Sequence, residues 1–411
     1  MSELFRLDDD DRFQRLRLIP WWDQTRLANS QVMVVGAGAI GNEVLKNLAL
    51  VGIGCLHIID MDDVETSNLT RSVLFRASDI GRSKVEAAAE EIEKISPTTQ
   101  VIRTKGNVLC DVGLGDFAQA DIVLGCVDNR EARLWINRSC WRVGRPWIDA
   151  GVQEIDGVIQ PFGMRQAPCY ECGLKDNDYR LLQARHSCLQ LDEDALTLGR
   201  VPTTPTVSAI VGGWQSQMAL KFLHQKPIAW GEALIVNGWQ DSTYRTKLPV
   251  KEDCLSHEAW DVDLRLGEQG RQMTVKQFLR ASGLAFGLGK PATLILEREF
   301  ISQLLCPVCQ ESVSILKNRW QVPKSMAMCP RCRVPRFPEI LHRVDSASSW
   351  SEHTLASLGV PRNDWVQVLC DDQLHVVSLC DDAGEESKND SQNPATCEGT
   401  GNSVVHPESQ S

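Results

Sequence analysis

The sequence lacks the features that would place it in a membrane or outside the cell. No apolar run approaches the roughly 20 residues that a membrane-spanning helix needs, and Met1–Arg6 is not a signal peptide. Basic residues are also in deficit, with 43 Lys and Arg against 54 Asp and Glu and a net charge of −11. Since nucleic-acid binders are usually basic, we expect a cytoplasmic protein that binds neither membranes nor nucleic acid.

A disulfide framework is not expected either. The chain has 15 cysteines, but without a secretion signal they are best interpreted as reduced thiols and metal ligands. At 411 residues the chain is long enough for two domains, each with its own core.

What the sequence does contain is a nucleotide-binding fingerprint near its start. An apolar strand, Val32–Val35, runs into the turn Gly36-Ala37-Gly38-Ala39-Ile40-Gly41. An amphipathic run, Asn42–Val51, and a second apolar strand, Cys55–Ile59, follow, and Asp60 ends the unit. This order predicts a βαβ unit whose helix N-terminus faces a phosphate. Alone, it would indicate NAD or FAD.

Each glycine of the turn has a predicted role. Gly36 permits the tight turn, Gly38 lets backbone N–H groups approach a phosphate, and Gly41 lets helix and strand pack closely.

Several later polar residues have no role in a dinucleotide site. They follow the order D-x-D…S-N-L-x-R…G-x-x-K…D-N and are Asn68, Arg71, Lys84 and Asp128. ATP would use them, because a triphosphate needs several cations and its Mg²⁺ needs a carboxylate. The series resembles the ThiF/MoeB/HesA adenylating enzymes of the ubiquitin-activating superfamily, over roughly residues 10 to 257.

The resemblance implies adenylation of the C-terminal glycine of a ubiquitin-like or sulfur-carrier protein. Arg71 and Lys84 would supply positive charge, Asp128 would hold Mg²⁺, and Asn68 would orient a phosphate. Asp60 would bind the ribose, with Asp62 also at the nucleotide. No general base is needed, because the attacking carboxylate is already ionised at neutral pH.

The N-terminal segment Arg12–Leu16 is similar to the R-Y-x-R-Q segment of the family. In relatives the second arginine, here Arg15, reaches the triphosphate of a neighbouring subunit, which implies a homodimer. The alternative is a surface arginine on an amphipathic helix. One departure is Ser72, where relatives usually have Gln, so one hydrogen bond to the nucleotide is in question.

Strands and helices alternate through residues 32 to 150, which predicts an α/β, Rossmann-like, mostly parallel sheet with helices on both faces. Ligands of such sheets bind at the carboxyl ends of the strands, where Gly36, Asp60 and Asp128 would converge. Residues 151–164 are predicted to form a hairpin that turns at Asp156-Gly157.

Two pairs of closely spaced ligands predict a zinc site in this domain, residues 1–257. They are Cys169 with Cys172, and Cys254 with His257. The family has a matching structural zinc, normally held by four cysteines, with His257 at the fourth position here.

Between these pairs lies a candidate nucleophile, Cys188, flanked by Arg185 and His186, which would favour a thiolate. In relatives a cysteine of a mobile crossover loop attacks the acyl-adenylate and forms a thioester, from which a conjugating enzyme receives the acyl group. The alternative is a bystander cysteine in a surface loop.

The rest of the chain departs from the family. Residues 258–380 are predicted to form a smaller α+β domain with strands at 261–266 and 292–297, helices at 274–286 and 353–358, and a hairpin at 366–379. It contains a zinc ribbon formed by Cys306, Cys309, Cys329 and Cys332. Docking of the carrier or a conjugating enzyme is a hypothesis for this domain. Residues 381–411 are expected to be disordered.

The expected cofactors are thus ATP, Mg²⁺ and Zn²⁺. The zinc domain, which lacks a rhodanese-like loop, favours conjugation over sulfur-carrier loading. Three alternatives remain: a sulfur-carrier activator that needs no cysteine, a dinucleotide oxidoreductase, and a non-enzymatic zinc scaffold.

Overall fold

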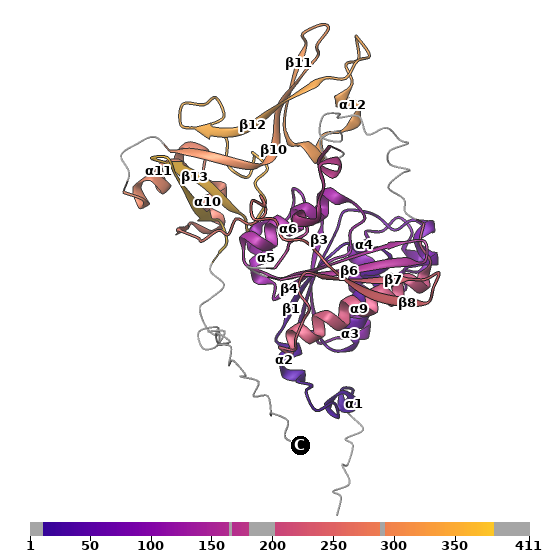
Figure 1. Ribbon diagram of the computed structural model, residues 1–411. Helices are drawn as coiled ribbons and strands as arrows, with labels where there is room; N and C mark the ends of the chain where they lie inside the picture. Colours follow the sequence, from indigo (N-terminus) through magenta and orange to yellow (C-terminus); the bar gives the residue numbers. More distant parts are fainter. Residues whose placement is uncertain (1–10, 164–166, 181–201, 288–291, 382–411) are drawn as a thin grey trace, which may run out of the picture.

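The computed structural model describes residues 11–163, 167–180, 202–287 and 292–381, which form two units, each built on one sheet (Figure 1). No helix in these ranges combines the length and the apolar character needed to cross a membrane. The first sheet contains β1 (Gln31–Val35), β2 (Cys55–Asp60), β3 (Gln100–Lys105), β4 (Ile122–Gly125), β5 (Trp147–Gln153), β6 (Asp156–Phe162), β7 (Glu232–Asn237) and β8 (Ser242–Lys247).

The strand order of this sheet is β3-β2-β1-β4-β5-β6-β7-β8, parallel from β3 to β5 and antiparallel beyond. The helices α3 (Ala39–Leu50), α4 (Lys84–Ile95) and α9 (Pro205–Leu223) share one apolar cluster with the sheet. On the other face, α5 (Leu114–Gln119) and α6 (Arg130–Arg142) share a second cluster. The predicted Rossmann-like sheet with helices on both faces is confirmed.

The hairpin between β5 and β6 turns earlier than predicted. Gln153 pairs with Asp156, so the two turn residues are Glu154 and Ile155, and Glu154 adopts a positive φ of 55°. Gly157 pairs with Val152 within the ladder. The prediction of a turn at Asp156-Gly157 was wrong because strand pairing outweighed local turn propensity.

The second unit has its own core between a sheet and α11 (Val275–Ala285), beside the short helix α10 (Gly267–Gln272). Its strands are β9 (Leu264–Arg265), β10 (Thr293–Leu305), β11 (Ser312–Asn318), β12 (Phe337–Asp345), β13 (Trp365–Cys370) and β14 (Gln373–Ser378). The outer ends of β10, β11 and β12 project beyond the core as an arm (Figure 1). The helix predicted at 353–358 is wrong, since these residues form turns.

The two units meet around one buried ion pair. Arg298 of β10 pairs with Asp364, whose side chain is only 1% exposed. The same guanidinium donates to the Val112 carbonyl at 2.8 Å and lies over the Trp135 ring, 4.8 Å from its centroid. The backbone N–H of Leu114 also donates to Asp364 (2.9 Å). The C-terminal unit is therefore anchored on the α5–α6 layer of the first unit.

Candidate nucleotide and metal sites

The glycine turn joins β1 to α3 in a tightly packed arrangement. A Cβ on Gly36, whose φ is +98°, would lie 2.4 Å from the Cys126 carbonyl oxygen, and one on Gly41 would lie 2.0 Å from the Gly36 oxygen. A Cβ on Gly38 would meet nothing within 4 Å. Gly36 and Gly41 are therefore required by packing, whereas Gly38, the N-cap of α3, leaves open space where a phosphate could approach the helix terminus.

Asp60 connects the end of β2 to this turn. Its carboxylate accepts hydrogen bonds from the backbone N–H groups of Ala37 (2.7 Å) and Asp62 (2.8 Å). Burial raises the pKa of Asp60, against the opposing effects of Lys84 and of these hydrogen bonds.

Lys84 begins α4 and lies among acidic groups at the same edge. Its ammonium donates to Asp62 Oδ2 at 2.7 Å, and its side chain is 11% exposed. Burial disfavours the ammonium, but the nearby charges of Asp60, Asp62 and Asp128 outweigh this effect and raise the pKa of Lys84. Four of the predicted nucleotide residues therefore share one electrostatic environment at the carboxyl ends of β2 and β4.

Asn68 and Arg71 lie in the segment that connects β2 to α4. Asn68 lies in a 3₁₀ turn, η1 (Thr66–Thr70), where its Oδ1 accepts from the Glu65 N–H at 2.9 Å. Arg71 donates to the Ser67 carbonyl at 2.8 Å. Asn68 is buried, and in this structure its oxygen organises the turn.

Asp128 follows β4 and has an exposed side chain. Asn129 caps α6 by accepting from the Ala132 N–H (2.8 Å), and its amide donates to Asp128 Oδ1 (3.3 Å). An exposed carboxylate at a strand end suits Mg²⁺, which keeps several waters and takes few protein ligands.

Three largely buried polar residues that support this edge were missed from the sequence. Asn42 donates to the carbonyls of Ala37 (2.7 Å) and Gly38 (3.0 Å), and its oxygen accepts from the Leu74 N–H (2.8 Å). Its position on the buried face of a predicted helix was the available signal. The other two bind groups from other elements, for which the sequence gives no signal. Gln215 donates to the Gly125 and Ile148 carbonyls. Arg133 pairs with Asp149 and donates to the Val127 carbonyl.

Arg15 lies at the opposite edge of the sheet. It belongs to α1 (Gln14–Arg17), and its neighbours Arg12 and Phe13 contact the far ends of α4 and α3, through the Ile95 carbonyl (2.7 Å) and Gly52 respectively. Both helices begin at the nucleotide edge and run about 18 Å before they end. Arg15 is exposed and remote from the nucleotide edge of its own chain.

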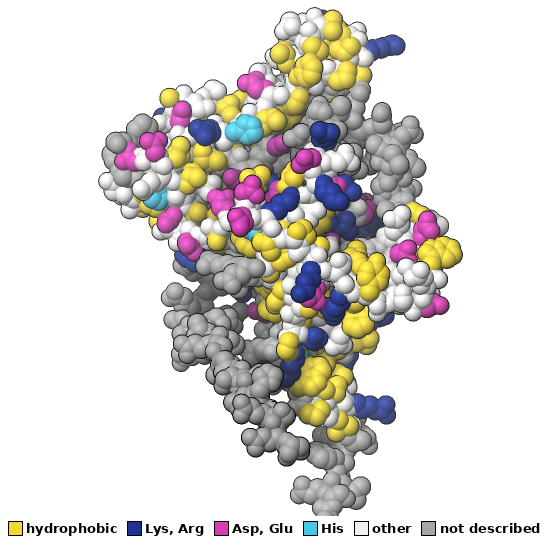
Figure 2. Space-filling model, in the orientation of Figure 1, with side chains coloured by type: hydrophobic (Ala, Val, Ile, Leu, Met, Phe, Trp, Pro, Cys, Tyr) yellow, Lys and Arg dark blue, Asp and Glu magenta, His cyan; other side chains and the backbone are white. Residues whose placement is uncertain are grey.

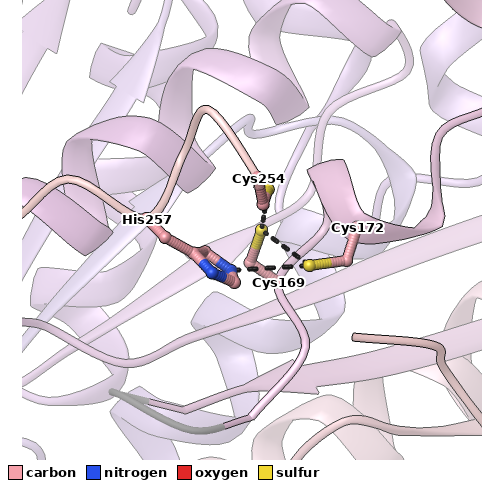
Figure 3. Close-up of side chains that lie close together, drawn as sticks. All are labelled: Cys169, Cys172, Cys254 and His257. Carbon is pink, nitrogen blue, oxygen red and sulfur yellow. Dashed lines mark hydrogen bonds between the residues drawn. The ribbon is translucent and has the colours of Figure 1, made fainter. Parts of the chain in front are cut away.

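The first cysteine cluster has zinc-like geometry (Figure 3). Cys169 Sγ lies 3.7 Å from Cys172 Sγ and 3.5 Å from Cys254 Sγ, and Cys172 Sγ lies 3.4 Å from His257 Nε2. All four ligand atoms lie within 4.8 Å of one another. Tetrahedral zinc with bonds near 2.3 Å separates sulfur ligands by about 3.8 Å, so the residues fit this metal.

Residues between the zinc ligands tie this cluster to α6. Glu171 is fully buried, and its carboxylate accepts hydrogen bonds from the Arg138 guanidinium at 2.7 and 3.2 Å. The Ser256 hydroxyl also donates to it. Although burial opposes the shift, these hydrogen bonds lower the pKa of Glu171. The Trp141 ring stacks on His257 at 4.0 Å.

The second cluster, Cys306, Cys309, Cys329 and Cys332, also brings its four sulfur atoms within 4.8 Å of one another. Cys309 and Cys329 are 3.7 Å apart. The backbone N–H of Cys309 lowers the pKa of Cys306 to about 6, which favours the thiolate that a metal requires. All eight predicted zinc ligands are therefore brought together in two groups of four.

The predicted nucleophile Cys188, with Arg185 and His186, lies outside the described residues, as do Cys397 and the tail 382–411. Burial raises the pKa of the other lone thiols of the first unit, which suits inert core cysteines; they are Cys55, Cys110, Cys126 and Cys140.

Comparisons with known proteins identify a family and related proteins for the first unit. A model of the ThiF family matches residues 11–256, more than half of the chain. The SUMO-activating enzyme subunit uba-2 of Caenorhabditis elegans is 36% identical over 157 residues, 38% of this chain and 27% of that protein. The adenylyltransferase and sulfurtransferase UBA4 of Candida albicans is 34% identical over 177 residues, 42% of this chain and 40% of that protein.

A crystal structure of E. coli MccB with MccA has a TM-score of 0.50 and 24% identity, covering 61% of this chain and 75% of that chain, and indicates a shared fold alone. The chain spans about a quarter to a half of the length of the curated relatives it matches.

Proposed function

This chain belongs to the ThiF family, and we propose on that premise that it is an ATP-dependent adenylyltransferase. Its substrate would be the C-terminal glycine carboxylate of a ubiquitin-like or sulfur-carrier protein. The observation that carries the proposal is Lys84, a buried ammonium beside the glycine turn and the carboxylates of Asp60, Asp62 and Asp128. A nicotinamide-binding site would not require a buried lysine among these carboxylates.

Catalysis of the proposed reaction would be mainly electrostatic. The incoming carboxylate attacks the α-phosphorus, the bond to pyrophosphate breaks, and an acyl-adenylate remains. The attacking group is already ionised, so the enzyme must offset its repulsion from the phosphates. Lys84 and Arg71 would contact the triphosphate, with the Gly38 backbone and Asn68 near its phosphates, while Asp60 would accept from the ribose.

Asp128 would hold Mg²⁺, which when bound neutralises phosphate charge and polarises the leaving group. In the nucleotide-free chain Asp62 is the counter-ion of Lys84. We infer that the triphosphate replaces Asp62 as the partner of the ammonium.

The position of Arg15 supports a homodimer. A residue at the far edge can serve only the crevice of another subunit, so Arg15 would act in trans. An apolar stripe on α9, with Ile210 49% and Trp214 40% exposed, supplies a surface for such pairing.

We propose two alternative fates for the acyl-adenylate and favour the first. Attack by Cys188 would give a thioester and release AMP, and a conjugating enzyme would then receive the acyl group. The alternative is a sulfur-carrier activator without a catalytic cysteine, which the similarity to UBA4 also supports.

The two cysteine clusters would each hold a structural zinc, because four protein ligands leave no open position. The arm would dock a partner protein. Hydrophobic side chains gather at its tip (Figure 2), where Val308 is 65% and Phe337 61% exposed. Val308→Asp with Phe337→Asp should weaken partner binding without reducing ATP binding, and unchanged partner binding would remove this role.

ATP:pyrophosphate exchange with purified candidate carriers tests the main proposal, followed by non-reducing gels to detect an adduct at Cys188. A thiol-labile adduct that disappears in Cys188→Ala supports the thioester route. Exchange without any adduct favours the sulfur-carrier alternative. Binding of NAD with no binding of ATP would refute adenylation itself.

A further inference from the structure

Residues 169–180 form a strap that is attached to α6 at two points, Arg130 and Arg138. One end is fixed at the first cysteine cluster, where Glu171 holds Arg138 at 2.7 Å. The other end is fixed by Asp178, whose Oδ1 lies 2.5 Å from the guanidinium of Arg130. The two attachment points on the helix are eight residues, or about 12 Å, apart.

The carboxylate of Asp178 is held in place by the strap itself. Its Oδ2 accepts from the Lys175 N–H at 2.9 Å, and its side chain is 22% exposed. The next residue, Tyr179, donates its hydroxyl to Glu171 at 3.0 Å. Because Asp178 is also held by the Lys175 N–H and is less exposed than Arg130 (22% against 47%), we take the carboxylate as the fixed member of the ion pair.

The position of Arg130 matters because Asp128 is only two residues away. Both side chains are exposed, and both lie at the N-terminal end of α6, on either side of the Asn129 cap. An arginine released from Asp178 could turn toward this exposed carboxylate, two residues away in the sequence. An Arg130–Asp128 pair would occupy the oxygen atoms that a divalent cation needs.

We propose that Asp178 is a positioning residue that holds Arg130 away from Asp128 and so leaves this carboxylate available to the Mg²⁺ that accompanies ATP. The inference rests on the proposed function, because it assigns Asp128 to the metal. It gives the strap a role that neither the fold nor the zinc cluster requires.

The test measures binding of a fluorescent N-methylanthraniloyl ATP to the full-length protein over a range of MgCl₂ concentrations. Four proteins are compared: wild type, Asp178→Asn, Arg130→Gln and the double variant. We expect Asp178→Asn to raise the Mg²⁺ concentration at half-saturation about fivefold, the size of one Coulomb interaction near water. Arg130→Gln alone should bind as wild type does, and the double variant should recover wild-type Mg²⁺ dependence.

Recovery in the double variant separates this role from a structural one. If Asp178→Asn weakens binding and the double variant stays weak, Asp178 merely supports the strap and the inference fails. An Asp178→Asn protein with wild-type Mg²⁺ dependence also overturns it. Zinc content is measured in all four proteins so that loss of metal is detected. Wild-type protein that binds no nucleotide would refute the proposed function as well.

Discussion

The ammonium of Lys84 lies 2.7 Å from Asp62 Oδ2 in a position only 11% exposed, at the first residue of α4. A mostly buried ammonium at a helix start is unusual for a structural contact, because an ammonium is more favourable near a helix C-terminus. The surrounding carboxylates keep the lysine charged, ready for a ligand more negative than they are.

Lys84→Met should reduce ATP:pyrophosphate exchange by about 10²–10³-fold, as removal of one preorganised charge or donor does in other active sites. The matched control is Lys94→Met, at the other end of the same helix, where the lysine is 67% exposed and pairs with Glu91. Exchange within twofold of wild type in Lys84→Met would contradict the proposed site.

If Arg15 acts in the nucleotide site of the partner subunit, two inactive variants should regain activity when their subunits are mixed. Arg15→Ala and Lys84→Met homodimers should each be inactive, but mixing equal amounts should restore about a quarter of wild-type sites, since half of the random dimers carry one intact site. The measurement is exchange activity after subunit mixing. No recovery, with mixed dimers demonstrated by mass spectrometry, would argue that Arg15 acts elsewhere.

Two zinc ions per chain are expected by elemental analysis, one for each cysteine cluster. Cys172→Ser and Cys309→Ser should each lose one, whereas Cys55→Ser, at a cysteine outside both clusters, should keep both. His257→Cys should keep the first zinc because four thiolates are equally suitable ligands. One zinc ion per wild-type chain would show that one of the two clusters does not bind zinc.

The buried pair between the units should be costly to break. Arg298→Met leaves Asp364 buried and unpaired, so we expect a destabilisation of about 3–5 kcal/mol. Removing both charges with Asp364→Leu in the same chain should recover part of it. The control is Lys276→Met at an exposed pair, 60% and 67% exposed, with an expected effect below about 1 kcal/mol. Thermal and urea unfolding measure the differences.

Asp116, at the same junction, gives a pH-dependent prediction. Burial raises its pKa to about 6 from an ordinary value of 3.8, despite hydrogen bonds from Asn363 and the Gly113 N–H. The folded chain therefore holds this proton more tightly than the unfolded chain. Its stabilising contribution is complete below about pH 4 and is lost as the pH rises through about 6.

Asp116→Asn should consequently gain in melting temperature relative to wild type as the pH rises from about 4 to 6. Only the change in this difference matters, since the substitution also alters one hydrogen bond. Asp23→Asn, at the exposed cap of α2 (Gln24–Ala28), serves as the control. A difference that stays constant over this range would contradict the assignment.

The sequence predicted those parts of the fold in which local pattern and tertiary structure agree. Apolar strands ending in Gly36, Asp60 and Asp128 identified the edge of the sheet, because strand direction fixes where such residues meet. The cysteine pairs were predictable for a similar reason, since each contributes two ligands from one tight turn.

Other parts depended on partners distant in sequence. Gln215 approaches the Gly125 carbonyl across 90 residues, and Arg298 meets Asp364 across 66, with no local signal for either. Asp156-Gly157 had strong turn propensity, yet pairing with β7 kept Gly157 in a strand. The length of β10 was also underestimated, because its outer half is stabilised by β11 and β12.

One helix contacts all three regions of interest. Along α6, Arg133 contacts the nucleotide edge through the Val127 carbonyl, Arg138 and Trp141 contact the first cysteine cluster, and Arg142 reaches Glu297 of the second unit at 2.7 Å. Each inserted or deleted residue would rotate everything beyond it by about 100° and shift it by about 1.5 Å. The length of this helix should thus be invariant in evolution even where its individual side chains are free to vary.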